Sequence, residues 1–204
     1  MIFLHGAGER GNDNKSQLVH GSFLFKSKDF RKNHPAIVVF PQCPEKSSWA
    51  NVKRNYEMSA GQKFDFFKKI SENRQLIMVE KLLDLIQKKY DIDETRRYVG
   101  GLSMGGMGTF ELVARNPDYF AAAFPICGGG NPHWSNLLKR SPFWIFHGED
   151  DGVVSVDFSR KMYEALSKEK ASVRLTIYPK VNHNSWDNSF AEPDLMHWLF
   201  SNKR

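Results

Sequence analysis

The segment Gly101-Leu102-Ser103-Met104-Gly105-Gly106 decides how this chain is interpreted. It follows an apolar run at residues 97–100 and leads into residues 104–116, whose pattern predicts a helix. A serine on so tight a strand-to-helix turn has a strained backbone, and glycines two residues away let the neighbouring chain approach closely. The turn would raise the hydroxyl clear of the sheet and point the helix N-terminus at it. We therefore predict that Ser103 is a nucleophile, the alternative being a glycine-rich turn that serves helix packing.

Short apolar runs alternate with longer helical patterns along the rest of the chain. Because the runs are apolar almost throughout, they are typical of strands that are buried on both faces of a parallel sheet. The predicted strands are residues 1–4, 36–40, 97–100, 121–126, 143–146 and 174–178. The predicted helices are residues 74–90, 104–116, 155–168 and 193–201. The alternation predicts an α/β fold in a single domain, residues 1–204, with a largely parallel sheet of about six strands flanked by helices.

Composition excludes several classes of protein. The net charge is +6, but Lys and Arg are scattered among Asp and Glu, which argues against a nucleic-acid partner. The sequence has no apolar stretch that could span a bilayer and no visible signal peptide, so as given it predicts a cytoplasmic protein without a membrane partner. Its two cysteines, Cys43 and Cys127, are far apart and form no pair of the kind that binds a structural metal.

A serine hydroxyl needs a base to remove its proton, and the base needs an acid to orient it. In enzymes with this kind of serine turn, the acid follows the serine in the chain and the histidine follows the acid. The predicted strand at residues 143–146 is followed by three candidate acids, Glu149, Asp150 and Asp151. We choose Asp151, with Asp150 as the alternative.

The base is expected in the loop after the last predicted strand. His183 lies there, and it is the only histidine between Asp151 and the C-terminal helix. Histidine changes its charge near neutral pH, so His183 could accept the serine proton and return it to the leaving group. His197 lies inside the predicted helix and is better interpreted as a packed or surface residue.

Backbone N–H groups are expected to stabilise the negative charge that develops during acyl transfer. The residue after the nucleophile, Met104, supplies one such group, and the glycine-rich loop after the first strand supplies the other. We predict the N–H of Ala7 as the second donor, with Gly8 as the alternative. This chemistry requires no metal and no organic cofactor.

At these residues the sequence resembles a known family. The run His5-Gly6-Ala7-Gly8-Glu9-Arg10-Gly11-Asn12-Asp13-Asn14, together with the serine segment, looks like the predicted-peptidase or carboxylesterase branch of the α/β-hydrolases. That branch is similar to dienelactone hydrolases, polyhydroxybutyrate depolymerases and feruloyl esterases. His147-Gly148 followed by Asp151 and Val154 resembles the family's acid motif, which favours Asp151 over Asp150. His183 with Trp186 resembles its histidine loop, and Trp49 its loop beside the active site.

The chain departs from the family at its N-terminus. Family members usually have two further strands before the strand that ends at His5, and these would lie upstream of Met1. The resemblance therefore implies a sheet that lacks these strands, with residues 36–40 as an exposed edge. An exposed edge can pair with another chain, so a homo-oligomer is one expectation. A leader peptide upstream of Met1 would change the expected location to secreted or periplasmic.

The sequence favours a serine hydrolase that cleaves small carboxylic esters through an acyl-enzyme intermediate. Two alternatives stand beside it, a serine peptidase of the same fold and a non-catalytic binding protein that retains the fold. Aromatic side chains in the loops are expected to line the substrate pocket, Trp49 and Trp186 first among them. Tyr56 and Trp134 are further candidates, although such residues are as often packing anchors.

Overall fold

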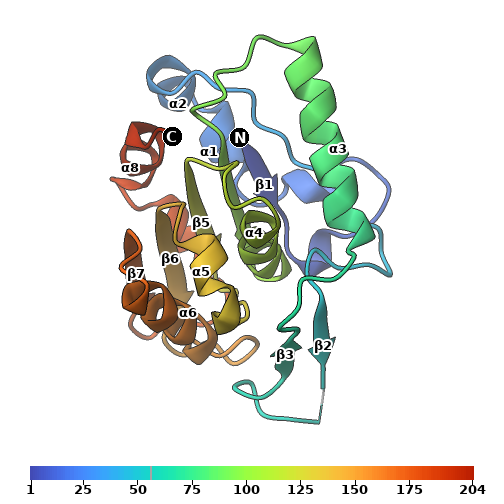
Figure 1. Cartoon of the computed structure of the whole chain (residues 1–204), viewed down its shortest axis with the longest axis vertical. Coiled ribbons are helices and arrows are strands. Elements are labelled where there is room, and N and C mark those ends of the chain that lie inside the picture. The colour runs from blue at the N-terminus through green and yellow to red at the C-terminus, as the bar shows by residue number, and fades with distance from the viewer. Residues whose placement is uncertain (56) are drawn as a thin grey trace.

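The computed structural model describes residues 1–55 and 57–204, and within them the centre is a five-stranded parallel sheet (Figure 1). The strand order is β1-β4-β5-β6-β7, and all four pairings are parallel. The strands are β1 (Ile2–Leu4), β4 (Tyr98–Leu102), β5 (Ala122–Ile126), β6 (Phe143–Gly148) and β7 (Val173–Tyr178). The predicted parallel α/β fold is thereby confirmed.

The prediction of a sixth strand at residues 36–40 is wrong. Val39 forms only one parallel bridge, to Ile2, and exchanges two backbone hydrogen bonds of 2.9 and 3.0 Å with Phe3 and Met1. Pro35 and Pro41 flank this segment, and proline has no N–H to donate to a ladder. The segment therefore runs beside β1 without extending the sheet as a full strand.

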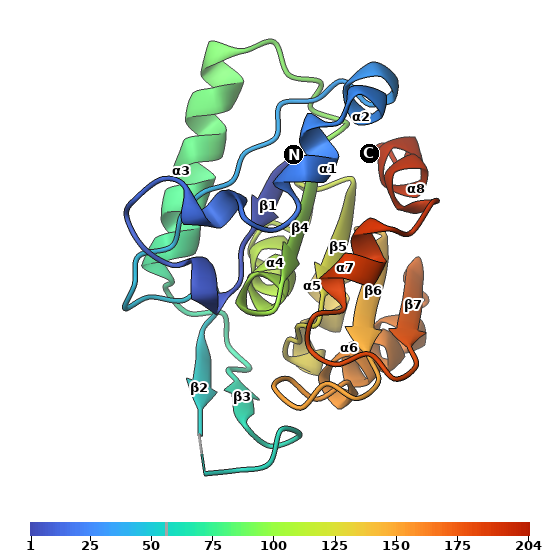
Figure 2. The ribbon, with the colours of Figure 1, turned by 180° about the vertical axis from the view of Figure 1, so that it is seen from behind.

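Helices cover both faces of the sheet (Figures 1 and 2). On one face, apolar side chains pack from α3 (Arg74–Lys89), α4 (Met104–Arg115), α5 (Ser135–Leu138) and α6 (Asp157–Lys168). On the other face they come from α1 (Ser22–Lys26), α2 (Lys28–Asn33), α7 (Trp186–Phe190) and α8 (Leu195–Ser201). Short 3₁₀ turns lie at Ala7–Glu9, Ser16–Leu18 and Pro132–Trp134. The four predicted helices correspond to α3, α4, α6 and α8, each with bounds within two residues of the prediction.

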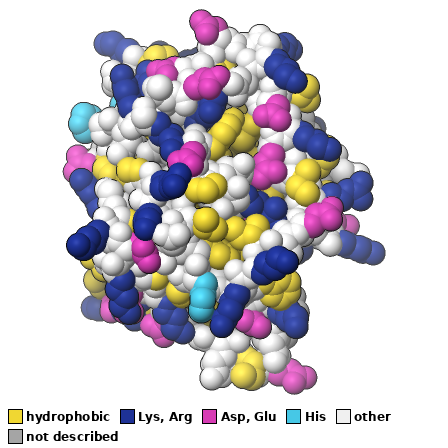
Figure 3. Space-filling model, in the orientation of Figure 1, with side chains coloured by type: hydrophobic (Ala, Val, Ile, Leu, Met, Phe, Trp, Pro, Cys, Tyr) yellow, Lys and Arg dark blue, Asp and Glu magenta, His cyan; other side chains and the backbone are white. Residues whose placement is uncertain are grey.

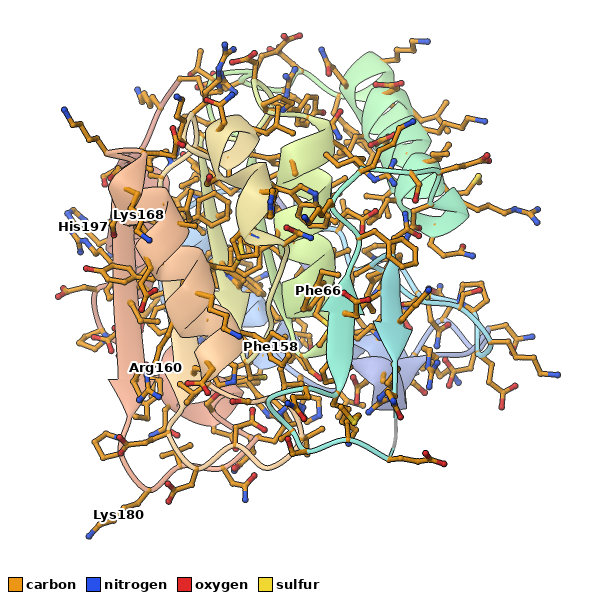
Figure 4. The ribbon with its side chains drawn as sticks, turned by 60° about the horizontal axis from the view of Figure 1, so that its bottom comes forward. Phe66, Phe158, Arg160, Lys168, Lys180 and His197 are labelled. Carbon is orange, nitrogen blue, oxygen red and sulfur yellow. The ribbon has the colours of Figure 1, made fainter. Side chains whose placement is uncertain are left out.

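A small antiparallel hairpin, not predicted from the sequence, extends below the sheet in Figure 1. It consists of β2 (Val52–Arg54) and β3 (Phe64–Phe66). Phe64 and Phe66 are buried, whereas Asp65 between them is exposed, as expected for a strand with one covered face. Figure 4 shows Phe66 close to Phe158 of α6, and their ring centres are 5.6 Å apart. These aromatic contacts attach the hairpin to the sheet domain beside the carboxyl ends of the strands.

The surface shows no concentration of one charge on the face seen in Figure 3, where Lys and Arg lie dispersed among Asp and Glu. Within residues 1–55 and 57–204, no helix combines the length and the apolar character needed to cross a membrane.

Candidate active site

Ser103 occupies the turn between β4 and α4. Its φ angle is 53°, in the left-handed region that residues other than glycine rarely adopt. A Cβ atom at Gly105 would overlap the carbonyl group of Leu4, and one at Gly101 would lie 2.5 Å from the carbonyl oxygen of Gly105. The glycines on either side therefore allow the close packing on which the strained turn depends.

The loops after β4, β6 and β7 meet at the carboxyl edge of the sheet and bring three distant side chains together. Nε2 of His183 lies 2.9 Å from Oγ of Ser103, and Nδ1 of His183 lies 2.7 Å from Oδ2 of Asp151. The imidazole is part-buried, and the carboxylate is fully enclosed. The arrangement is a continuous hydrogen-bonded chain from a hydroxyl through an imidazole to a buried acid.

Asp151 is held by the loop that carries it. Its Oδ1 accepts hydrogen bonds of 2.9 Å from the N–H groups of both Val153 and Val154. Burial alone would raise the pKa of Asp151, but hydrogen bonds from His147, His183 and Val154 outweigh it and hold that pKa well below its usual range. Its carboxylate therefore stays ionised beside His183 at neutral pH.

The two competing acids on the same loop lie elsewhere. Glu149 and Asp150 are exposed, and Glu149 lies 4.0 Å from the guanidinium of Arg160 at the surface. Of the three acids that the sequence offered, the structure brings only Asp151 to His183. His197 is exposed on α8, far from the hairpin side of the molecule (Figure 4).

The loop after β1 lies beside the serine and is held in place by several hydrogen bonds. Nδ1 of His5 donates to the carbonyl of Gly6 at 2.6 Å, and its Nε2 accepts from the N–H of Cys43 at 2.9 Å. Nε of Arg10 donates to the carbonyl of Ala7 at 2.8 Å. Ala7, Ser103 and Met104 line the same cavity, so both N–H groups expected to bind an oxyanion belong to residues beside the nucleophile.

That cavity has a volume of about 160 Å³. Its lining comes from the loop after β1, the segment before the hairpin, the hairpin itself, the serine turn with α4, and the acid loop. It consists of Ala7, Arg10, Ser48, Val52, Arg54, Phe64, Ser103, Met104, Met107, Val153 and Val154. The contribution of the hairpin was not predicted from the sequence. The alternation of Phe64, Asp65 and Phe66 was the available signal for a half-buried strand there.

A larger cavity, of about 380 Å³, opens at the amino ends of the strands, where Met1, Tyr98 and Phe120 contribute to its lining. It lies at the opposite end of the sheet from Ser103. The position of the nucleophile therefore identifies the smaller cavity as the candidate substrate site, although cavity size would favour the other.

The predicted pocket tryptophans have different positions. Trp186 is half-buried beside His183, the candidate base, and the centres of the two rings are 5.6 Å apart. The structure does not place Trp49 among the described residues that line the Ser103 cavity. It is buried, and its indole N–H donates to the carbonyl of His5 at 3.1 Å, so it anchors the loop after β1. Trp134 is also a packing anchor, bonded to the carbonyl of Lys68, and Tyr56 lies outside the described residues.

Cys127, Asp151 and His183 carry potential metal ligands that all lie within 4.8 Å of one another. The acid and the imidazole already bond to each other, and burial raises the pKa of the Cys127 thiol above its usual range. A thiol that keeps its proton is a poor metal ligand. The chemistry of this cluster favours proton transfer over metal binding.

Comparison with proteins of known sequence and structure gives a consistent result. A crystal structure of a thermostable esterase superimposes on the whole chain with a TM-score of 0.89 and 37% sequence identity. This chain covers 54% of that protein, or about half its length. A ferulic acid esterase matches 98% of this chain and 83% of its own, with a TM-score of 0.66 and 15% identity, which shows the fold alone.

Two curated relatives match shorter stretches. A bifunctional acetylxylan esterase/xylanase from Neocallimastix patriciarum is 35% identical over 78 residues, which are 38% of this chain and 12% of the relative. Poly(3-hydroxyalkanoate) depolymerase C from Paucimonas lemoignei is 38% identical over 55 residues, which are 27% of this chain and 13% of the relative. The family model described as phospholipase/carboxylesterase matches residues 1–194. The chain therefore belongs to the phospholipase/carboxylesterase family of α/β-hydrolases, and its parallel sheet and serine turn agree with this match.

Proposed function

We propose that this protein hydrolyses carboxylic esters through an acyl-enzyme intermediate formed on Ser103. The observation that carries the proposal is the chain of two hydrogen bonds, 2.9 and 2.7 Å long, that joins Ser103 through His183 to Asp151. Its family and the esterases that resemble it in sequence and structure support the same chemistry.

In the proposed first half-reaction, Oγ of Ser103 attacks the ester carbonyl while its proton moves to Nε2 of His183. The N–H groups of Ala7 and Met104 bind the oxyanion that forms. The C–O bond of the ester then breaks, and His183 gives its proton to the departing alcohol. In the second half-reaction, His183 takes a proton from water, the hydroxide attacks the acyl-enzyme, and Ser103 recovers its proton as the acid departs.

The cavity beside Ser103 favours a small acyl group. Its volume of about 160 Å³ and its apolar lining by Val52, Phe64, Met107 and Val154 fit a short or compact acyl chain. Trp186, beside His183, lies where we expect the alcohol part of the ester to contact the protein. Peptide cleavage uses the same groups, and it requires protonation of a poorer leaving group.

The ester hydrolysis is tested with 4-nitrophenyl acetate and butyrate. We expect turnover by the parent protein and a loss of about 10⁴-fold or more in kcat/KM for Ser103→Ala, because the attacking atom is removed. Ser167→Ala is the matched control, since it makes the same change at an exposed serine near the C-terminal end of α6, outside the lining of the cavity. Turnover that survives Ser103→Ala would remove the nucleophile assignment, and cleavage of matched anilides at the rate of esters would favour a peptidase. Absence of turnover by the parent protein on either type of substrate would favour a binding protein that retains the fold.

We further propose that residues 1–204 form one domain and that the open edge beside β1 can pair with a second copy of the chain. Ile37 on this edge is 40% exposed, and the segment around Val39 has backbone groups that β1 does not occupy. The dependence of the sedimentation coefficient on protein concentration tests this pairing.

A further inference from the structure

We propose that His147 is a positioning residue for this reaction, which holds the carboxylate of Asp151 at the same oxygen atom that His183 contacts. The inference rests on the proposed function, because it assigns a role within the same group of residues. It adds a second imidazole, from β6, to the acid that orients the base.

Both imidazoles reach the same oxygen atom. Oδ2 of Asp151 lies 2.7 Å from Nδ1 of His183 and 3.2 Å from Nε2 of His147. Nε2 of His147 also lies 2.8 Å from the carbonyl oxygen of Val154. Since a carbonyl oxygen only accepts, this Nε2 carries a hydrogen, which it shares between the carbonyl and the carboxylate.

The other side of the His147 ring is fixed as well. Its Nδ1 lies 2.7 Å from Oγ of Ser159 on α6, and that hydroxyl lies 3.3 Å from the carbonyl oxygen of Gly128. His147 and Ser159 are both fully buried. The ring is therefore held at both nitrogens and cannot turn away from Asp151 without leaving a buried polar group without a partner.

The donors around Asp151 divide between its two oxygens. Val153 and Val154 donate to Oδ1, whereas His147 and His183 approach Oδ2. The titratable groups that face this carboxylate are His147 from β6, His183 from the loop after β7, and the Cys127 thiol at the end of β5. Glu149 and Asp150, its neighbours on the acid loop, are exposed.

The direction in which loss of the His147 donor would move the pH dependence of kcat/KM can be predicted. A buried carboxylate with one donor fewer binds a proton more strongly, and it also attracts the proton of the neighbouring imidazolium more strongly. His183 then becomes a free base only at higher pH. The acid limb of kcat/KM against pH should therefore move to higher pH.

His147→Gln and His147→Asn make a matched pair for the test. The amide nitrogen of glutamine reaches the position of Nε2 and can still donate to Asp151, whereas that of asparagine reaches only the position of Nδ1. With 4-nitrophenyl acetate, we expect the acid limb of His147→Asn to move up by about one pH unit and that of His147→Gln by less than half as much. The KM of both variants should stay close to that of the parent protein, because the side chain at position 147 does not itself line the substrate cavity.

Equal acid limbs in folded His147→Asn and in the parent protein would overturn the proposal, whatever the change in thermal stability. If neither variant folds, ¹⁵N NMR of the parent protein decides the question: the proposal requires hydrogen on Nε2 of His147 throughout the active pH range, and an Nε2 without it would contradict the proposal. The NMR readout does not depend on turnover. A protein without esterase activity would therefore contradict the proposed function while the contact between His147 and Asp151 could still be measured.

Discussion

The backbone of Ser103 and the surroundings of Asp151 show how single residues are adapted in this site. The serine keeps a positive φ angle that glycines on both sides make possible, and the aspartate is buried with every oxygen bonded. Burying an ionised carboxylate costs free energy of folding unless hydrogen-bond donors surround it. The structure therefore supplies these donors at Asp151 and leaves Asp150, the next residue, exposed.

This contrast gives a prediction for the acid. Asp151→Asn should lower kcat/KM for 4-nitrophenyl acetate by about 10⁴-fold, because the amide cannot hold His183 in the same tautomer. The matched control, Asp150→Asn, should change it by less than about twofold, since that side chain is exposed. Circular dichroism would check that both variants fold. A large loss in the Asp150 variant with little loss in the Asp151 variant would reverse the assignment.

The sequence was informative about residues whose chemistry depends on local pattern. Ser103 followed from the spacing of its glycines, and His183 from its position after the last strand. Asp151 was separated from Asp150 only by resemblance to a family motif, because neighbouring acids on a loop do not reveal which one turns inward. Trp49 was expected in the pocket, but the structure buries it against His5, through contacts between segments 44 residues apart.

At the scale of elements, the β2–β3 hairpin closes the candidate acyl cavity. Phe64 lines this cavity, and its ring packs 5.9 Å from that of Phe158. Lys53 on the adjacent strand is exposed. Under the proposed function, we therefore expect the aromatic side chain of Phe64 to limit the size of the acyl group.

Phe64→Ala should enlarge the cavity and move the preference of the enzyme toward longer acyl chains. We expect the ratio of kcat/KM for 4-nitrophenyl octanoate to that for the acetate to rise by about tenfold, and Lys53→Ala to leave the ratio unchanged. A ratio that stays constant in a folded Phe64→Ala variant would show that the acyl chain lies elsewhere.

The elements differed in how well the sequence predicted them. The long helices α3 and α4 repeat an apolar pattern over several turns, and the central strands are apolar throughout, so both give clear signals. A strand of three residues such as β2, and helices of four to six residues such as α2 and α5, contain too few positions to show a period. Their structure depends on tertiary packing more than on local preference.

At the scale of the whole molecule, the two edges of the sheet differ in how their outermost strands are paired. At one end β7 pairs only with β6, and at the other the segment around Val39 covers β1 with a single bridge. Sedimentation velocity over a range of concentrations tests whether this second edge pairs. We expect the weight-average sedimentation coefficient to rise with concentration toward that of a dimer. A constant monomer value across the range would exclude pairing through this edge.

We propose that Ser103, His183 and Asp151 act together as one catalytic unit, and covalent labelling is the sharpest test of this proposal. The parent protein is treated with a fluorophosphonate, digested, and analysed by peptide mass. We expect one adduct, on the peptide that contains Ser103. Labelling should be slowed by about 10³-fold or more in His183→Ala, because the hydroxyl then lacks its base. An adduct on another residue, or equally fast labelling of Ser103 without His183, would contradict this proposal.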